Sequence, residues 1–240
     1  MSRIVDALNR SLDKTKRDYG TAQVVDCTLL APAARAASTH PAIEVTHETA
    51  QDAALRFRGS RVTVLNFASA NHPGGGVRKG AKAQEEALCA CSGLLHGLES
   101  CMALYQANNA PNAPKEGYDR MIYSEDVPLV LDGKLQPVPT MRINVITYSA
   151  PNCLRKQFTR KEAQDIFERR IRHVLLQADH CNSEVLILGA WGCGAYGNDP
   201  NIVAAAFKEA LAEGCNTTSK LVFAIYGNAE NQQVFGSAFA

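Results

Sequence analysis

The sequence predicts an α/β fold in which helices cover both faces of a central β-sheet. Three observations lead to this prediction. Several strand-length runs are apolar throughout, such as "RVTVLNFAS" and "EVLILGA", and strands of this kind are buried on both faces. Helical stretches alternate with these runs, and two glycine-rich loops, "NHPGGGVRKGAK" and "WGCGAYGND", each follow a strand and precede a helix. Ligands of such sheets bind beyond the carboxyl ends of the strands, so both loops are candidates for a binding site.

The first quarter of the chain has a different pattern from the rest. Residues 2–17 and about 45–57 are expected to be helices, with Thr46 and Thr49 as possible N-caps of the second. A connection that contains Ala and Pro separates them. We therefore expect residues 1–60 to be a helical accessory region that packs on a core.

Residues 61–240 are expected to form that core, so that the whole chain is one domain. After a strand at 61–69 and the glycine loop, a helix is expected from about Gln84 to Gln106, broken near Ser92. The clearest helix, which ends near residue 180, begins at Thr159, which forms a capping-box pattern with Glu162. The other expected elements are short strands within 120–132, a strand at 141–151, a strand at 184–190, a helix at 200–214 and a strand at 220–227.

Composition argues against several classes of protein. The chain has 25 Lys and Arg against 24 Asp and Glu, a net charge of +1, so we expect neither sequence-specific nucleic-acid binding nor a membrane partner. No apolar run reaches the roughly 18 residues of a membrane helix, and the first 20 residues lack the apolar run of a secretory signal. The expectation is a monomer in the cytoplasm, or in the nucleus if the source is a eukaryote.

The eight cysteines are expected to be reduced and to pack as small apolar side chains. Cys89, Cys91 and His96 form a C-x-C-x4-H pattern that could belong to a zinc site, but no fourth ligand is evident. We therefore expect no metal site, and the sequence indicates no cofactor.

Neither glycine loop matches a nucleotide-binding motif in full. Gly192, Gly194 and Gly197 fit G-x-G-x-x-G, but the next strand ends in "AIYGN" without the acidic residue that a dinucleotide-binding fold needs. In the first loop, Ala81 stands where a P-loop has Lys. Both loops still offer backbone N–H groups at strand-to-helix junctions, which suit an anion such as a diphosphate. Two turns without a ligand are the alternative.

Three stretches together resemble the microbial poly(ADP-ribose) glycohydrolases. "NFASANHPGGGVRKGAKAQEEALC" contains their glycine triplet, a spacer and Gln-Glu-Glu. "LGAWGCGAYGND" is similar to their diphosphate loop, and "VFAIYGN" to the strand end that supplies an aromatic ring to adenine. The stretches occur in the family's order over about residues 61–228. The resemblance implies a macrodomain-like fold, a three-layer α/β/α sandwich with a mixed central sheet and a helical N-terminal extension, which binds ADP-ribose.

The resemblance also implies roles for individual residues. Glu86 matches the catalytic acid and base, and Glu85 matches the neighbour that orients the ribose. The vertebrate members have Asn at the position of Ser69, so the ribose partner stays open between Asn66, Ser69 and Asn71. The other implied substrate-binding residues are Gly74, Gly75, Gly76 and Val77 near the distal ribose and diphosphate, Gln84 of the signature, Gly192, Cys193, Gly194, Ala195, Tyr196, Gly197 and Asn198 of the diphosphate loop, with Tyr196 beside the ribose, and Tyr226 at the adenine.

The residue types fit the hydrolysis of a glycosidic bond. Such reactions pass through an oxocarbenium-like state and use carboxylates. Adjacent residues of a helix point about 100° apart, so Glu85 and Glu86 cannot face each other across a bond and need different roles. The leading hypothesis is a metal-independent poly(ADP-ribose) glycohydrolase that cleaves ribose–ribose O-glycosidic bonds from the chain end and releases ADP-ribose. The alternatives are a hydrolase of mono-ADP-ribose attached to a protein side chain or nucleic acid, and a non-catalytic reader of ADP-ribose, which the intact Gln84-Glu85-Glu86 disfavours.

Overall fold

The sheet is the centre of the molecule. The computed structural model describes residues 2–31 and 40–240, and within them seven strands form one mixed sheet. Across the sheet the strands are β1 (Thr21–Asp26), β4 (Arg120–Leu131), β5 (Pro137–Tyr148), β3 (Val62–Phe67), β6 (Val185–Leu188), β7 (Lys220–Ala224) and β2 (Ala42–Thr46). The β1–β4 and β4–β5 pairs are antiparallel, and the remaining pairs are parallel. The carboxyl ends of the parallel strands therefore meet at one edge of the sheet.

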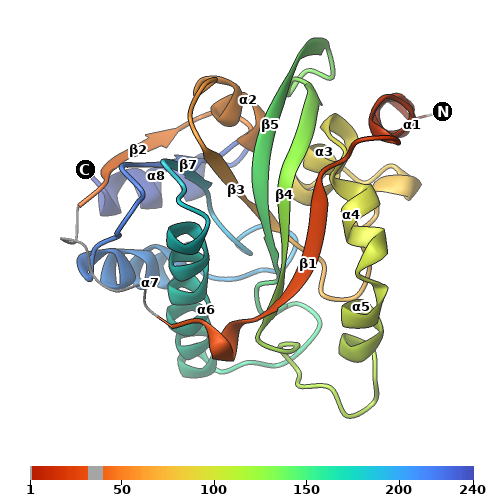
Figure 1. The fold of residues 1–240 in the computed structure, drawn as a ribbon. Coiled ribbons are helices and arrows are strands. Elements are labelled where there is room, and N and C mark those ends of the chain that lie inside the picture. Colours follow the sequence, from red (N-terminus) through yellow and green to blue (C-terminus); the bar gives the residue numbers. More distant parts are fainter. Residues whose placement is uncertain (1, 32–39) are drawn as a thin grey trace.

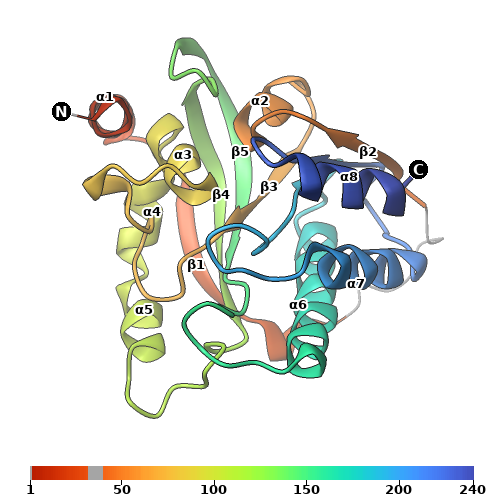
Figure 2. The ribbon, with the colours of Figure 1, turned by 180° about the vertical axis from the view of Figure 1, so that it is seen from behind.

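Helices form a layer on each side of this sheet (Figures 1 and 2). The first layer consists of α1 (Arg3–Thr15), α2 (Ala50–Leu55), α3 (Gln84–Cys91), α4 (Leu94–Ser100) and α5 (Met102–Asn108). The second layer consists of α6 (Arg160–His180), α7 (Pro200–Ala212) and α8 (Ala229–Ala238). Short 3-10 turns at Cys27–Leu29 and Val77–Lys79 complete the secondary structure of the described residues.

The central strands supply both apolar cores. Val62 and Val64 of β3 pack toward the first helical layer, whereas Leu65 packs toward the second. In β6, Ile187 packs toward the first helical layer and Leu188 toward the second. Alternating side chains of a strand point to opposite faces, so these apolar runs are strands buried on both faces, and the predicted three-layer α/β sandwich is confirmed.

The first 60 residues contain more than helices. The predicted N-terminal helix is confirmed as α1, but β1 and β2 form the two edges of the sheet and were not predicted. A helix over 45–57 is wrong in its first part, because Thr46 belongs to β2, which pairs with β7. Thr49 is the N-cap of α2, and its side chain accepts a hydrogen bond from Asp52 N. Part of the predicted connection between the helices lies outside the described residues.

Two further differences concern helices. The region from 84 to 106 is three short helices, since the expected break at Ser92 is followed by a second at Cys101. Helix α8, capped by Asn228, was not predicted. The capping box of α6 is present as predicted. Within the described part of the chain, no helix combines the length and apolar character needed to cross a membrane.

Candidate active site

A cavity of about 350 Å³ lies at the carboxyl ends of β3, β6 and β7. Its walls come from the loop before α2, the end of β3, the start of α3, the loop after β6 and the segment after β7. The charged residues of the wall are Glu48, Lys82, Glu85 and Glu86. Both glycine loops of the sequence reach this cavity, as expected for a sheet of this kind.

Gln84, the first residue of α3, joins this helix to the end of β3. Its Oε1 accepts from Phe67 N at 2.8 Å, and its Nε2 donates to Leu65 O at 3.0 Å. The N–H of Phe67 and the C=O of Leu65 are on the side of β3 that pairs with β6, but the pairing of these two strands ends at Val64 and Ile187. The Gln84 amide therefore takes the place of β6 where the two strands diverge, and it fixes the start of α3 in the gap.

Glu85 is buried and fully engaged by the end of β3. Its Oε2 accepts from Ser69 N at 2.7 Å, and its Oε1 accepts from Asn66 Nδ2 at 3.3 Å. Asn66 Nδ2 also donates to Thr147 Oγ1 at 3.2 Å, so the carboxyl group belongs to a network within the sheet. Both oxygens of Glu85 are thus fixed by the protein.

The surroundings of Glu85 shift its ionisation. The pKa of this carboxyl is raised from 4.5 to about 8, mainly by burial and also by the negative charge of Glu86, against the opposing effect of the Ser69 N–H. At neutral pH Glu85 therefore retains its proton for most of the time. A neutral Glu85 reduces the negative charge in a cavity that is proposed to take an anion.

Glu86 faces the glycine triplet. Its Oε1 accepts from Gly76 N at 2.9 Å, and its Oε2 has no hydrogen bond within the described residues. Gly75 has a φ of +58°, and a Cβ at this position would lie 2.4 Å from Glu86 Oε1 and 3.1 Å from Glu85 Oε2. Only glycine fits here, because a side chain would displace both carboxyl groups.

The loop after β6 presents a row of backbone donors. The N–H groups of Gly194, Ala195 and Tyr196 have no hydrogen-bond partner among the described residues, and all three residues line the cavity. Successive free N–H groups in a turn form a site for an anion. This row is the feature of the loop that suits a diphosphate.

Asn198 and Gly192 set the shape of that loop. Asn198 is buried, and its Nδ2 donates to Pro151 O at 2.8 Å and to Gly192 O at 2.9 Å. Its Oδ1 accepts from Cys153 Sγ at 3.1 Å. At Gly192, where φ is +78°, a Cβ would lie 2.7 Å from Asn198 Nδ2. The hydrogen bonds of the Asn198 side chain therefore fix the shape of the loop, and the residue does not line the cavity.

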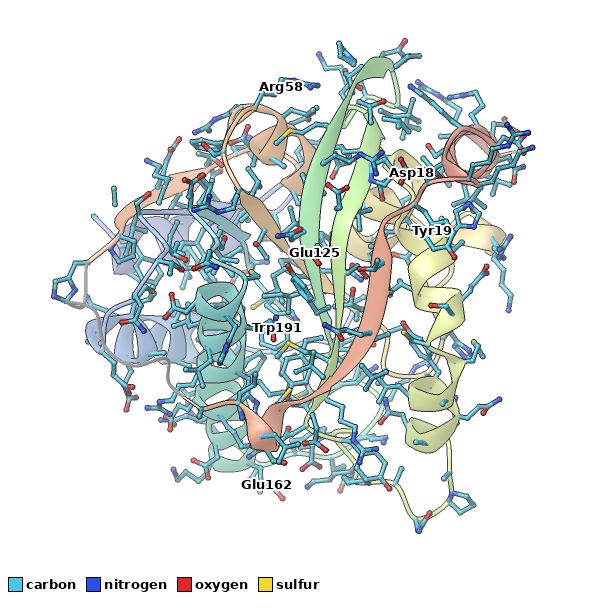
Figure 3. The ribbon with its side chains drawn as sticks, viewed as in Figure 1. Asp18, Tyr19, Arg58, Glu125, Glu162 and Trp191 are labelled. Carbon is cyan, nitrogen blue, oxygen red and sulfur yellow. The ribbon has the colours of Figure 1, made fainter. Side chains whose placement is uncertain are left out.

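Two aromatic residues of the same loop, Tyr196 and Trp191, also line the cavity. Tyr196 OH donates to Ala68 O at 3.3 Å and so links the loop to the end of β3. Trp191, to which the sequence analysis gave no role, is fully buried between α6 and the sheet (Figure 3), where its Nε1 donates to Tyr148 O at 3.2 Å. It also packs edge-on against Phe167 of α6. These contacts hold the loop against the rigid part of the molecule.

Tyr226 lies at the other end of the cavity, just beyond β7. The residue lines the cavity and is 71% exposed, a high value for an aromatic side chain. An exposed flat ring beside a cavity is suited to stacking on an aromatic ligand.

Comparison with known proteins identifies the family. Residues 3–132 match the family model "Microbial-type PARG, catalytic domain". The chain belongs to the microbial-type poly(ADP-ribose) glycohydrolase family. Among curated proteins, none matches the sequence.

Solved structures of bacterial poly(ADP-ribose) glycohydrolases share the whole fold. The enzyme from Thermomonospora curvata is 29% identical over 98% of this chain and 99% of its own, with a TM-score of 0.88. The same protein with the inhibitor ADP-HPD gives a TM-score of 0.86. The enzyme from Deinococcus radiodurans in complex with ADP-ribose is 32% identical over 95% of this chain and 94% of its own, with a TM-score of 0.79.

The glycohydrolase residues expected from the sequence do not all lie on the cavity wall. Of the open alternatives for the ribose, Ser69 lines the cavity, whereas Asn66 is buried behind Glu85 and Asn71 Nδ2 donates to Asn109 Oδ1 at 2.7 Å. The expected residues on the wall are Gly75, Gln84, Glu85, Glu86, Gly192, Gly194, Ala195, Tyr196 and Tyr226. Those that do not line the cavity are Gly74, Gly76, Val77, Cys193, Gly197 and Asn198.

The Cys89, Cys91 and His96 side chains have separate surroundings. Cys91 Sγ donates to Asp132 O at 3.3 Å, Cys89 is buried, and His96 Nε2 lies 3.1 Å from Leu12 O. No group of three or more His, Cys, Asp or Glu side chains that could hold a metal ion occurs in the described residues.

Several residues of the cavity wall were not predicted from the sequence. The segment from Glu48 to Gln51 enters the wall because β2 pairs with β7, and β2 was not predicted. Asn228 and Asn231, at the start of α8, also line the cavity. The N-cap pattern at Asn228 was a signal that could have found this helix, but the first segment carries no motif.

Proposed function

We propose that the protein is a poly(ADP-ribose) glycohydrolase that cleaves ribose–ribose bonds at the chain end, with Glu86 as the general acid and base. Membership of the family supports the reaction class. The enzyme from Deinococcus radiodurans binds ADP-ribose and that from Thermomonospora curvata binds ADP-HPD, and we infer that ADP-ribose occupies the same cavity here.

One observation carries the assignment of roles to the two glutamates. Both oxygens of Glu85 accept hydrogen bonds from the end of β3, whereas Glu86 has one oxygen bonded to Gly76 N and the other free of protein partners. A general acid must reach the leaving oxygen within hydrogen-bond distance. The free oxygen of Glu86 is available for this contact, and Glu85 is left to orient the ribose.

The proposed reaction has two proton transfers. Glu86 donates a proton to the leaving ribose oxygen as the glycosidic bond breaks, and the resulting carboxylate then removes a proton from the attacking water. The charge on the ribose is positive in between, and the diphosphate held by the N–H groups after β6 supplies a nearby negative charge. The side chains account for each proton without a metal ion, so we propose that the reaction is metal-independent.

The substrate assay separates this proposal from its alternatives. The protein is incubated with automodified poly(ADP-ribose) and, separately, with proteins and nucleic acid that carry mono-ADP-ribose, each with and without EDTA. We expect ADP-ribose monomer from the polymer from the earliest times, with equal rates in both buffers. Oligomers as early products would contradict cleavage from the chain end.

The other results have equally definite meanings. Release from mono-ADP-ribosylated targets alone would replace the proposal by the first alternative, and ADP-ribose binding without release from any substrate would replace it by the reader. Loss of activity in EDTA that zinc or magnesium restores would contradict metal independence.

A further inference from the structure

The ring of Tyr226 is covered on one side by His47. The two rings stack with their centroids 5.8 Å apart and an angle of 23° between their planes. Tyr226 remains 71% exposed and lines the cavity, whereas His47 is not part of the cavity wall. One face of Tyr226 is therefore occupied by the protein, and the rest of the ring is open to a ligand.

The backbone brings the two rings together. His47 follows β2 and Tyr226 follows β7, and the parallel pairing of these strands continues with Ile225 N donating to Thr46 O at 2.9 Å. The chain then turns at Gly227, where φ is +74°, and Gly227 N donates to His47 Nε2 at 3.5 Å. The imidazole thus contacts both the Tyr226 ring and the backbone of the next residue.

We propose that His47 is a positioning residue that holds Tyr226 as a fixed platform for the base of a nucleoside diphosphate sugar. The inference rests on the proposed function, because it takes the ADP-ribose base to stack on Tyr226. His47 contributes through Tyr226 and makes no contact with the ligand itself.

The physical reason is the cost of ordering an exposed side chain. An exposed tyrosine without a neighbour samples several rotamers, and ligand binding must select one of them. The hydrogen bond from Gly227 N holds the His47 ring, and the stack on that ring selects the Tyr226 rotamer before the ligand arrives. The benefit appears in the affinity for the ligand and in KM, while the rate of the chemical step at Glu86 is unaffected.

A double-mutant cycle tests this inference by calorimetric titration with ADP-ribose. We expect His47→Ala to raise Kd about two- to tenfold, the range that one immobilised side chain represents. Tyr226→Ala is expected to raise Kd about ten- to a hundredfold, and the double variant should bind no more weakly than Tyr226→Ala. His47→Phe restores a stacking ring and should return Kd to within about twofold of the parent.

Kinetics and a control complete the test. In His47→Ala we expect KM to rise while kcat at saturation stays at the parental value. The control is His40→Ala, which replaces an exposed histidine just before the start of β2 and should change neither KM nor kcat. Thermal melts show that each variant is folded.

Two results would overturn the inference. One is a His47→Ala protein that binds ADP-ribose with the Kd of the parent. The other is a double variant whose Kd rises by the product of the two single increases, since His47 would then act independently of Tyr226. In both cases normal binding of ADP-ribose by the parent leaves the proposed function in place. A parent that does not bind ADP-ribose would overturn the proposed function and this inference with it.

Discussion

Glu85 and Glu86 are neighbours in the first turn of α3, yet their surroundings give them different properties. Glu85 is enclosed by the end of β3, and burial raises its pKa to about 8. Glu86 lies against the backbone of the glycine triplet and keeps one oxygen free of protein partners. The pair therefore divides into a carboxyl group with both oxygens bonded by the protein and one with a free oxygen, which is the basis of the two roles proposed for them.

The raised pKa of Glu85 predicts how stability changes with pH. Between about pH 4.5 and 8 the unfolded chain loses this proton while the folded protein keeps it, so stability falls as pH rises through this window. Glu85→Gln removes this dependence. We expect the melting temperature of the variant minus that of the parent to be several degrees higher at pH 8 than at pH 5. About 2–4 °C corresponds to 1 kcal/mol of stability for a chain of this size.

The measurement is a set of thermal melts of both proteins at pH 5, 6, 7 and 8. Glu209→Gln, on the exposed face of α7, is the control. A constant difference between Glu85→Gln and the parent over this range would contradict the raised pKa.

Gly75→Ala is the smallest change that tests the contact between the triplet and Glu86. The new methyl group would lie 2.4 Å from Glu86 Oε1, and an L-residue at a φ of +58° costs about 1–2 kcal/mol. We expect turnover to fall at least tenfold and the melting temperature to fall by a few degrees, because the clash moves the carboxyl group that we propose as the general acid and base.

Turnover and thermal melts of the purified variant check this expectation. Gly236→Ala in α8, where an added Cβ meets no atom within 4 Å, is the matched control and should keep the parental rate. Parental turnover in Gly75→Ala would show that the triplet is an ordinary turn.

At the scale of elements, the site is built where β3 and β6 diverge. Gln84 occupies the gap on the β3 side, and Asn198 shapes the loop that leaves β6. The Gln84 amide bonds the two backbone groups of β3 that β6 leaves without a partner, and the Asn198 amide bonds two carbonyl groups of the loops beyond β5 and β6. The cavity is therefore held by hydrogen bonds from two side chains, one at the start of α3 and one in the loop after β6.

Asn198→Ala tests the second of these supports. The change leaves Pro151 O without this donor and leaves Gly192 O with only the backbone N–H of residue 198, at 3.1 Å. We expect a loss of about 1–3 kcal/mol in the free energy of unfolding. ADP-ribose should also bind at least tenfold more weakly, because the loop that carries the free N–H groups from Gly194 to Tyr196 loses the contacts that fix its shape.

Denaturant unfolding and calorimetric titration measure the two effects, and Asn112→Ala in an exposed loop is the control. Unchanged affinity in a destabilised Asn198→Ala would show that the loop shape does not govern ligand binding.

At the scale of the whole molecule, the sequence predicts the parts that are buried and local. The runs that form β3 and β6 are apolar on both faces, and the Thr159 capping box marks the start of α6. The glycine triplet with Gln84-Glu85-Glu86 also points to the correct family, because these residues form one compact unit at the start of α3.

The remaining parts depend on pairing between distant segments. β1 and β2 are short, half-exposed edge strands without an apolar run, and only their partners β4 and β7 define them. For the same reason no local pattern places Glu48 on the cavity wall or His47 beside Tyr226. Likewise, the hydrogen bonds of the Gln84 and Asn198 side chains to backbone groups depend on the three-dimensional arrangement of the strands.

The most direct test of the central claim is Glu86→Gln, assayed for both turnover of poly(ADP-ribose) and binding of ADP-ribose. The amide has nearly the same size and can still accept the hydrogen bond from Gly76 N, but it cannot transfer a proton. We expect turnover to fall by about 10²–10⁴-fold, the usual contribution of a general acid and base, while Kd for ADP-ribose stays within about threefold of the parent. A folded Glu86→Gln protein with turnover near that of the parent would contradict the account.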